Sequence, residues 1–283
     1  MRIKISVIIF VLALFGTGVV YAAGTPTGTI TSPEANAITF GNVELAATYD
    51  DGDDINDDIV QWAVREGTCS AGTNTVVGNV DGFNDPYTWD GADFSAMFDA
   101  TSLDAGLYCF IFNPKDDAGE PDVRETQLFY IVQDYVHGGG HALEEMGSKR
   151  KNWLDFSFGG IVGDAGSAGL IGTWQVNLHN VGADLDKSKF HMDTVTDLNF
   201  FASNSATCTS AVNFTGWGRW NKEEGSKITF RAGDTDDTVR IEIWDSSNVK
   251  VYDSNSTGEF PAESSCVGTA RTGLDNGNIT INF

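Results

Sequence analysis

Carboxylates are the residue type most concentrated in this sequence, and their spacing could bind a cation. Between the predicted second and third strands, six of them fall within nine residues: Asp50, Asp51, Asp53, Asp54, Asp57 and Asp58. Such a run repels itself unless solvent or a cation screens it, and calcium prefers oxygen ligands. Asp234, Asp236 and Asp237 form a second acidic group before a predicted strand. Calcium binding and a solvated acidic loop are the alternatives for both groups.

Aromatic residues form the second candidate site. Tyr87 and Trp89 stand in a predicted loop, and Trp217, Arg219 and Trp220 form a compact group later in the chain. Aromatic rings flanked by polar groups can stack on sugars, and exposed aromatics mark contact sites. We therefore expect either a glycan-binding platform built from these five residues or ordinary packing in the core.

Nucleophilic catalysis finds no support in the sequence. His137–Gly140 and Ala165–Gly169 resemble fragments of esterase motifs, but a nucleophile elbow needs a strand, a turn and a helix in a parallel sheet. The chain shows no alternation of strands and helices, so we predict no catalytic residue. A glycoside-active enzyme stays a third alternative, because its two carboxylates cannot be selected among 40 acidic residues.

The elements that must position these residues are strands. Short runs of alternating apolar and polar residues recur along the chain, separated by clusters of Gly, Asn and Asp, which is typical of all-β proteins. We predict two β-sandwich domains in tandem, at residues 24–133 and 134–283. The glycine-rich segment 136–141 is expected to be the linker or the entry to the second domain.

The first domain resembles the immunoglobulin fold. Asp104, Gly106 and Tyr108 match the tyrosine corner of that fold, and Trp62 resembles its buried core tryptophan. The position two residues after the tyrosine, where antibody domains carry a cysteine, is a phenylalanine here. The resemblance implies an immunoglobulin-like sandwich. Cys109 has the opposite parity to Tyr108 and should point away from it, so we expect its disulfide at the periphery and not between the sheets as in antibodies.

The second domain resembles bacterial extracellular β modules of the "post-COAP" type, which are appended to surface proteins. The resemblance depends on three glycines at 138–140, then Lys149 and Arg150, an aromatic strand, and a late Gly-Asn-Ile-Thr-Ile strand at 277–281. It implies an extracellular structural module and names no ligand.

The N-terminus predicts export. Arg2 and Lys4 precede an apolar run that ends near Phe15, and small residues follow, which is the pattern of a signal peptide at residues 1–23. The apolar run is shorter than the roughly 20 residues that a membrane-spanning helix needs, and no later stretch is apolar enough to span. We therefore predict a secreted or cell-surface protein without a transmembrane segment after cleavage.

Cysteines in an exported chain predict disulfides. The four are Cys69, Cys109, Cys208 and Cys266. Three pairings are possible, and the pairing within each half, Cys69 with Cys109 and Cys208 with Cys266, is the simplest.

The net charge of the chain limits the classes of partner that it can bind. The formal net charge is −23, which disfavours nucleic acid and anionic lipid. Residues 24–133 hold 20 acidic and 3 basic residues, whereas residues 134–283 hold 20 and 12. We predict a non-catalytic extracellular or cell-surface protein with a structural, adhesive or assembly role. Its expected partners are other surface proteins, further copies of itself, or glycans. The alternatives are a carbohydrate-binding protein, with or without calcium, and a glycoside-active enzyme.

Overall fold

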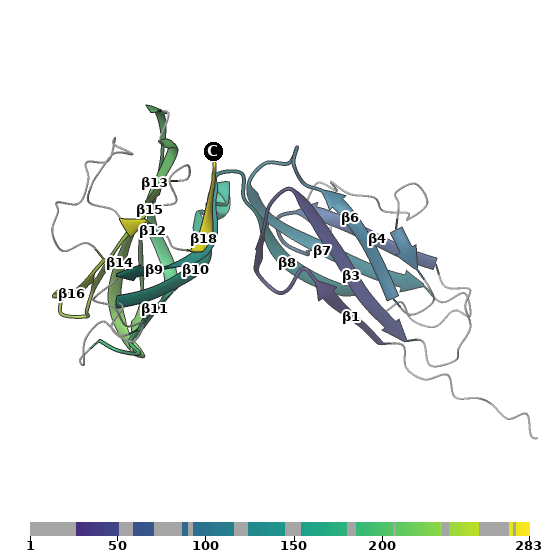
Figure 1. Cartoon of the computed structure of the whole chain (residues 1–283). Coiled ribbons are helices and arrows are strands. Elements are labelled where there is room, and N and C mark those ends of the chain that lie inside the picture. Colours follow the sequence, from purple (N-terminus) through teal and green to yellow (C-terminus); the bar gives the residue numbers. More distant parts are fainter. Residues whose placement is uncertain are drawn as a thin grey trace, which may run out of the picture.

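A computed structural model describes most of the chain after residue 26. The described residues are 27–50, 59–70, 87–89, 93–115, 124–144, 154–179, 185–205, 208–233, 238–254, 272–273 and 276–283. They form two β units side by side, called here the first unit (27–131) and the second unit (135–283) (Figure 1). The predicted signal peptide lies outside the described residues. Within these ranges, no helix is long and apolar enough to cross a bilayer.

The first unit packs two sheets of four strands face to face. One sheet has the order β1 (Thr27–Ser32), β3 (Asn42–Asp50), β6 (Asp93–Asp99), β5 (Tyr87–Trp89). The other has the order β2 (Ala37–Thr39), β8 (Glu125–Ile131), β7 (Gly106–Lys115), β4 (Ile59–Glu66). Only β2 and β8 pair in parallel among these strands. This arrangement confirms an all-β fold and, for this unit, two facing sheets.

Alternation along the strands builds the core between these sheets. Every second residue of β3 and β6 is buried, and the Phe94 ring of β6 lies 5.4 Å from the Phe112 ring of β7, measured between centroids. Trp62 and Tyr108 are also buried in this core. The Tyr108 hydroxyl donates a hydrogen bond of 2.8 Å to the Asp104 carbonyl oxygen, which is the contact that defines a tyrosine corner.

The disulfide of the first unit joins Cys69 to Cys109, as predicted. Because neighbouring residues of a strand point to opposite faces, Cys109 points away from the core that contains Tyr108. It packs instead in a small outer cluster with Ala63 and Ile111, so the predicted peripheral position is confirmed. For the second predicted disulfide, only the backbone of Cys208 is described, and Cys266 lies outside the described residues.

The second unit is one continuous curled sheet of ten antiparallel strands, which corrects the prediction of a second sandwich (Figure 1). Its order is β16 (Lys250–Asp253), β15 (Thr238–Trp244), β14 (Glu223–Gly233), β13 (Cys208–Trp220), β12 (Lys189–Ser205), β11 (Leu170–His179), β10 (Leu154–Asp164), β9 (Tyr135–Glu144), β18 (Asn276–Asn282). The short β17 (Thr272–Gly273) pairs with β15.

Curling lets a single sheet enclose its own core. The Phe158 ring on β10 lies 5.4 Å from the Phe230 ring on β14, although three strands separate β10 from β14 in the sheet. Register shifts within β12 against β13 add local twist, as β-bulges do. The apolar residues of the inner face therefore pack against one another without a second sheet.

Glycines allow neighbouring strands to approach closely where the sheet curls. A Cβ atom on Gly138 of β9 would overlap the Asn278 carbonyl oxygen of β18, and one on Gly160 of β10 would overlap the Thr173 carbonyl oxygen of β11. The glycine-rich segment 136–141 is therefore part of β9, the first strand of the second unit, so of the two alternatives predicted for it, linker or domain entry, it forms the entry. Close contact between strands, and not the flexibility of a hinge, requires glycine at these positions.

The two units contact each other around the β8–β9 connection. The predicted boundary between residues 133 and 134 falls inside this connection. The Phe40 ring of the first unit stacks on Tyr135 and His137 of β9, at centroid distances of 4.3 and 5.0 Å. Asn282, near the C-terminal end, donates a hydrogen bond of 2.7 Å to the Gln133 carbonyl oxygen. Both strands β9 and β18 thus hold the connection in place.

Candidate binding groove

The predicted aromatic platform is only partly assembled. Trp217 is 42% exposed, and Arg219 on the same strand is also exposed. Trp220 is only 7% exposed and belongs to the core of the second unit. The three residues therefore do not present one outer surface, because alternation turns Trp220 inward at the end of β13. Including Trp220 in the platform was wrong.

Tyr87 and Trp89 belong to a different unit. They form strand β5 at the edge of the first unit, and not the loop that the sequence predicted. Their side chains lie outside the described residues. Of the five predicted platform residues, Trp217 and Arg219 are therefore the two that the structure describes on an exposed surface.

The calcium prediction stays a prediction. Asp50 is the last residue of β3, whereas residues 51–58 and 234–237 lie outside the described residues. Within the described ranges, no group of three or more His, Cys, Asp or Glu side chains is arranged to hold a metal ion.

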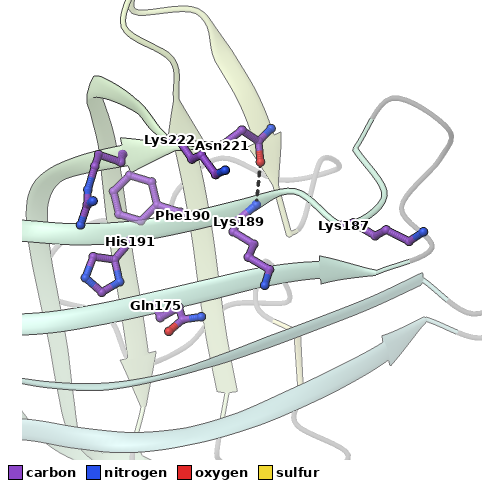
Figure 2. A pocket seen from close by; sticks show the side chains of 8 residues that line it. Gln175, Lys187, Lys189, Phe190, His191, Asn221 and Lys222 are labelled. Carbon is purple, nitrogen blue, oxygen red and sulfur yellow. Dashed lines mark hydrogen bonds between the residues drawn. The ribbon is translucent and has the colours of Figure 1, made fainter.

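The second unit has a groove that the sequence did not predict. It has a volume of about 610 Å³ and lies beside the middle of β11, the start of β12 and the end of β13 (Figure 2). It is called here the basic groove. The residues that line it are Gln175, Lys187, Lys189, Phe190, His191, Arg219, Asn221 and Lys222. Half of these residues are lysine or arginine, in a chain whose net charge is −23.

Strand alternation places the polar residues of the basic groove on the outer face. On β12, Phe190 and Met192 are completely buried, while Lys189 and His191, which alternate with them, are exposed. His191 lies opposite Gln175 of β11 on one side and opposite Arg219 of β13 on the other. These three side chains therefore form one row across three neighbouring strands, about 4.8 Å apart per strand.

Two turns supply the remaining cations from unusual backbone conformations. Asn221 and Lys222 form the two-residue turn between β13 and β14, with φ angles of 52° and 79°. Lys187, in the turn before β12, has a φ of 67°. Among the described residues, five that are not glycine have positive φ, and three of them line this groove. Such conformations are sparsely populated for residues with a Cβ and cluster at functional sites.

Asn221 fixes the geometry between these two turns (Figure 2). Its side-chain oxygen accepts a hydrogen bond of 2.9 Å from the Lys189 backbone N–H, and its amide nitrogen donates one of 3.1 Å to the Ser188 hydroxyl. Its own backbone N–H donates to the Lys189 carbonyl oxygen at 2.8 Å. The β13–β14 turn is therefore attached to the start of β12, which keeps Lys189 and Lys222 on the same groove.

Arg219 is the one arginine of the groove, and it is already paired. Its guanidinium donates two hydrogen bonds to Asp193, Nε to Oδ2 at 3.1 Å and an Nη atom to Oδ1 at 2.9 Å. This bidentate contact raises the pKa of Arg219 above its usual value. The His191 ring lies 4.0 Å from the same carboxylate. Asp193 thus orients both side chains along the wall of the groove.

The three lysines differ from Arg219, because no described carboxylate pairs with them. Among the ion pairs of the described residues, none includes Lys187, Lys189 or Lys222. All three residues are exposed. A concentration of like charge on a concave surface raises the local concentration of oppositely charged ligands. The arrangement is therefore suited to bind anions, and it holds no nucleophile paired with a base.

A second ionic cluster on the same unit is structural. Arg240 lies 3.2 Å from Glu242 and 3.1 Å from Asp253, and Lys250 lies 3.1 and 2.8 Å from the same two carboxylates. Arg240, Glu242 and Asp253 are largely buried. Hydrogen bonds to Asp253 and Glu242 raise the pKa of Lys250. Through these shared carboxylates the cluster connects β15 to β16.

No known protein family matches the chain. No curated protein matches it either. Among solved structures, it is similar to a DUF4784 family protein from Bacteroides caccae ATCC 43185, with 8% identity over 82% of this chain and 70% of the other, and a TM-score of 0.22. It is also similar to Dpr2 Ig1-Ig2 in complex with DIP-Theta Ig1-Ig3, with 8% identity over 80% and 81% of the two chains, and a TM-score of 0.22.

One pattern in the sequence could have indicated the groove. Lys187, Lys189 and His191 occupy every second position, which places basic side chains on one face of a strand. Arg219 and Lys222 are 28 and 31 residues further along than His191, and only the pairing of β12 with β13 brings them together.

Proposed function

We propose that this chain is an exported, non-catalytic protein with an adhesive role, and that it holds an anionic partner in the basic groove of its second unit. Export is supported by the disulfide between Cys69 and Cys109, since disulfides persist in oxidising compartments. The N-terminal signal pattern and the resemblance to bacterial surface modules support the same location.

In this proposal the first unit is an immunoglobulin-like spacer. Its strand order, β1-β3-β6-β5 facing β8-β7-β4, corresponds to the ABED and GFC sheets of that fold. The hydrogen bond from Tyr108 to Asp104 and the burial of Trp62 support the same assignment. The stacking of Phe40 on Tyr135 and His137 favours a fixed placement of the spacer against the second unit.

The observation that carries the adhesive role is the contrast between Lys187, Lys189 and Lys222 and the rest of the chain. A protein with 40 acidic and 17 basic residues leaves these three lysines exposed around one groove, without a described acidic partner. Two of them keep left-handed backbone conformations, which cost free energy for any residue with a Cβ. An anionic partner would explain why lysine, and not glycine, is kept at these two positions.

Adhesion is tested with the mature chain, residues 24–283, produced with its disulfide intact. Fluorescently labelled protein is incubated with cells and insoluble extracellular material of the source culture, and the bound fraction is measured at 50 and 500 mM NaCl. The proposal predicts saturable binding that high salt releases, because exposed charges are screened. Absence of saturable binding, or binding equal to that of albumin at both salt concentrations, would contradict an adhesive role.

A further inference from the structure

The basic groove has the features of a site for an anionic polysaccharide, and we propose that it binds one carboxylated or sulfated glycan chain, with Trp217 stacking on a sugar ring beside the groove. This inference rests on the proposed adhesive function and names the class of partner.

The cations follow a line that suits an extended polymer. Lys189 and His191 occupy successive outward positions at the start of β12, about 7 Å apart for extended backbone, and Lys187 stands in the turn just before them. Arg219 flanks His191 on the neighbouring strand, and Lys222 approaches from the turn. Anionic groups repeated along a flexible polymer could engage several of these cations at once, which raises the avidity of weak individual contacts.

Trp217 supplies a feature that small anions do not need. It lies two residues before Arg219 on β13, so both side chains are on the outer face of the sheet. Within the described ranges it is one of four large apolar residues that are clearly exposed, with 42% of its surface accessible. An exposed indole beside charged groups can stack on the apolar face of a sugar ring. The exposed face of Trp217 therefore extends the groove beyond its cations.

Neutral hydrogen-bonding groups in the groove suit sugar hydroxyls. Gln175 lies in the same row as His191 and donates a hydrogen bond of 3.1 Å to the side-chain oxygen of Asn177. This contact orients the Gln175 amide. It leaves the Gln175 side-chain oxygen as an acceptor and the Asn177 amide nitrogen as a donor for a ligand. Amides beside cations, next to an exposed indole, match a ligand that carries both hydroxyl and acidic groups.

The surroundings of the groove disfavour nucleic acid. Duplex DNA carries one charge per roughly 1.7 Å of its axis and is bound through broad basic surfaces. The groove encloses only about 610 Å³, and the second unit still holds 19 acidic against 12 basic residues. A rigid polyanion would face these carboxylates, whereas a flexible glycan can enter the groove alone.

The test measures the affinity of residues 24–283 for defined polymers by isothermal titration calorimetry at 50 mM NaCl. Polygalacturonate presents carboxylates, dextran sulfate presents sulfates, dextran is neutral, and duplex DNA is a polyanion without free sugar hydroxyls. We expect at least one acidic polysaccharide to bind about tenfold more tightly than both dextran and DNA. Whether polygalacturonate or dextran sulfate binds more tightly identifies the acidic group, carboxylate or sulfate, that the groove prefers. Equal or tighter binding of DNA, or no preference over dextran, would overturn the inference.

Three variants locate the binding. K187Q/K222Q removes two groove cations, and K115Q/R124Q removes two cations from the first unit, so both change the net charge equally. We expect K187Q/K222Q to weaken binding about tenfold or more, W217A to weaken it about fivefold, and K115Q/R124Q to leave it unchanged. Circular dichroism and the melting temperature check that each variant is folded. Unchanged binding by folded K187Q/K222Q or by folded W217A would overturn the inference.

Failure of the glycan-binding inference and failure of the proposed adhesive role give different experimental results. If the chain adheres to cells in a salt-sensitive way, but K187Q/K222Q adheres equally and polygalacturonate and dextran sulfate do not compete, the inference is wrong while adhesion stands. If the chain does not adhere at all, the proposed function itself is wrong.

Discussion

The two units bury similar alternating strands in different ways. The first unit places one four-stranded sheet on another, and its inward aromatic residues meet across the gap, as Phe94 meets Phe112. The second unit curls a single sheet until β10 and β14 face each other, as Phe158 meets Phe230. The comparison shows that a period of two determines which residues are buried in both units, and that the same period is compatible with two packed sheets or with one curled sheet.

The largest effect is expected at the glycines of the curled sheet. In G160A, the added Cβ would overlap the Thr173 carbonyl oxygen and press on Trp174, and backbone cannot move as a flexible side chain can. We expect a loss of more than about 3 kcal/mol in the stability of the second unit, as for severe overpacking. Hydrogen exchange of the intact chain, followed by mass spectrometry, measures the protection of each unit separately.

The adjacent residue provides the matched control. A Cβ on Gly159 would lie 3.6 Å from the Gly138 carbonyl oxygen, which is an ordinary contact. G159A should therefore keep the protection of β9 and β10 close to that of the unmodified chain. Equal effects of G159A and G160A would show that close approach at Gly160 is not what the curled sheet requires.

A smaller effect, confined to the other unit, is expected from the disulfide. Cys69 and Cys109 are 40 residues apart, and a crosslink over a loop of this length typically contributes about 2–4 kcal/mol. In C69A/C109A, protection should fall in β4 and β7 and stay unchanged in β10 to β14. A loss shared equally by both units would indicate that the units unfold together, and that the comparison between them does not extend to stability.

A third effect depends on pH and acts on the second unit. The partners of Lys250 raise its pKa above the ordinary lysine value of 10.5. The charged form therefore stabilises the fold fully below pH 10.5, and this contribution is lost as the pH rises through the raised pKa. K250M should be less stable than the unmodified chain at pH 8 by urea unfolding, and the difference should shrink by pH 11.5. A difference that is constant or grows with pH would contradict the pairing with Glu242 and Asp253.

The smallest effect on stability is expected in the groove and has the opposite sign. Lys222 has a φ of 79°, a conformation that glycine adopts without a steric cost. An Asn-Gly pair is also the preferred sequence for a two-residue turn whose central residues both have positive φ. K222G should therefore raise the stability of the second unit by about 0.5–1 kcal/mol, measured by urea unfolding. K189G is the contrasting variant, because it places glycine within strand β12 and should destabilise.

The sequence predicted the first unit better than the second. Its features are local: the alternation of β3, the spacing from Asp104 to Tyr108 and the parity of Cys109 each follow from a few neighbouring residues. The closure of the second unit is not local, since the close approach at Gly138 involves Asn278 of β18, 140 residues further along the chain. For this reason the sequence left segment 136–141 open between a linker and the entry to the second domain.

Prediction of the candidate site from the sequence was limited in the same way. Trp217 and Arg219 were predicted from their types and proximity in sequence, and the structure places both on the outer face. Trp220 has the opposite parity to both, so continued alternation along β13 separates it from them, a signal that grouping the three by residue type and proximity overlooked. Lys187 and Lys189 were missed, since the turn that joins them to Lys222 is formed by β12 and β13 together.

The most direct test of the account is the affinity of K187G/K222G for the better of the two acidic polysaccharides, measured by calorimetry at 50 mM NaCl. Both lysines occupy left-handed backbone positions where glycine fits without strain. The account predicts a folded protein at least as stable as the unmodified chain that binds about tenfold more weakly or worse. Unchanged affinity in this folded variant would contradict the claim that the basic groove is the binding site.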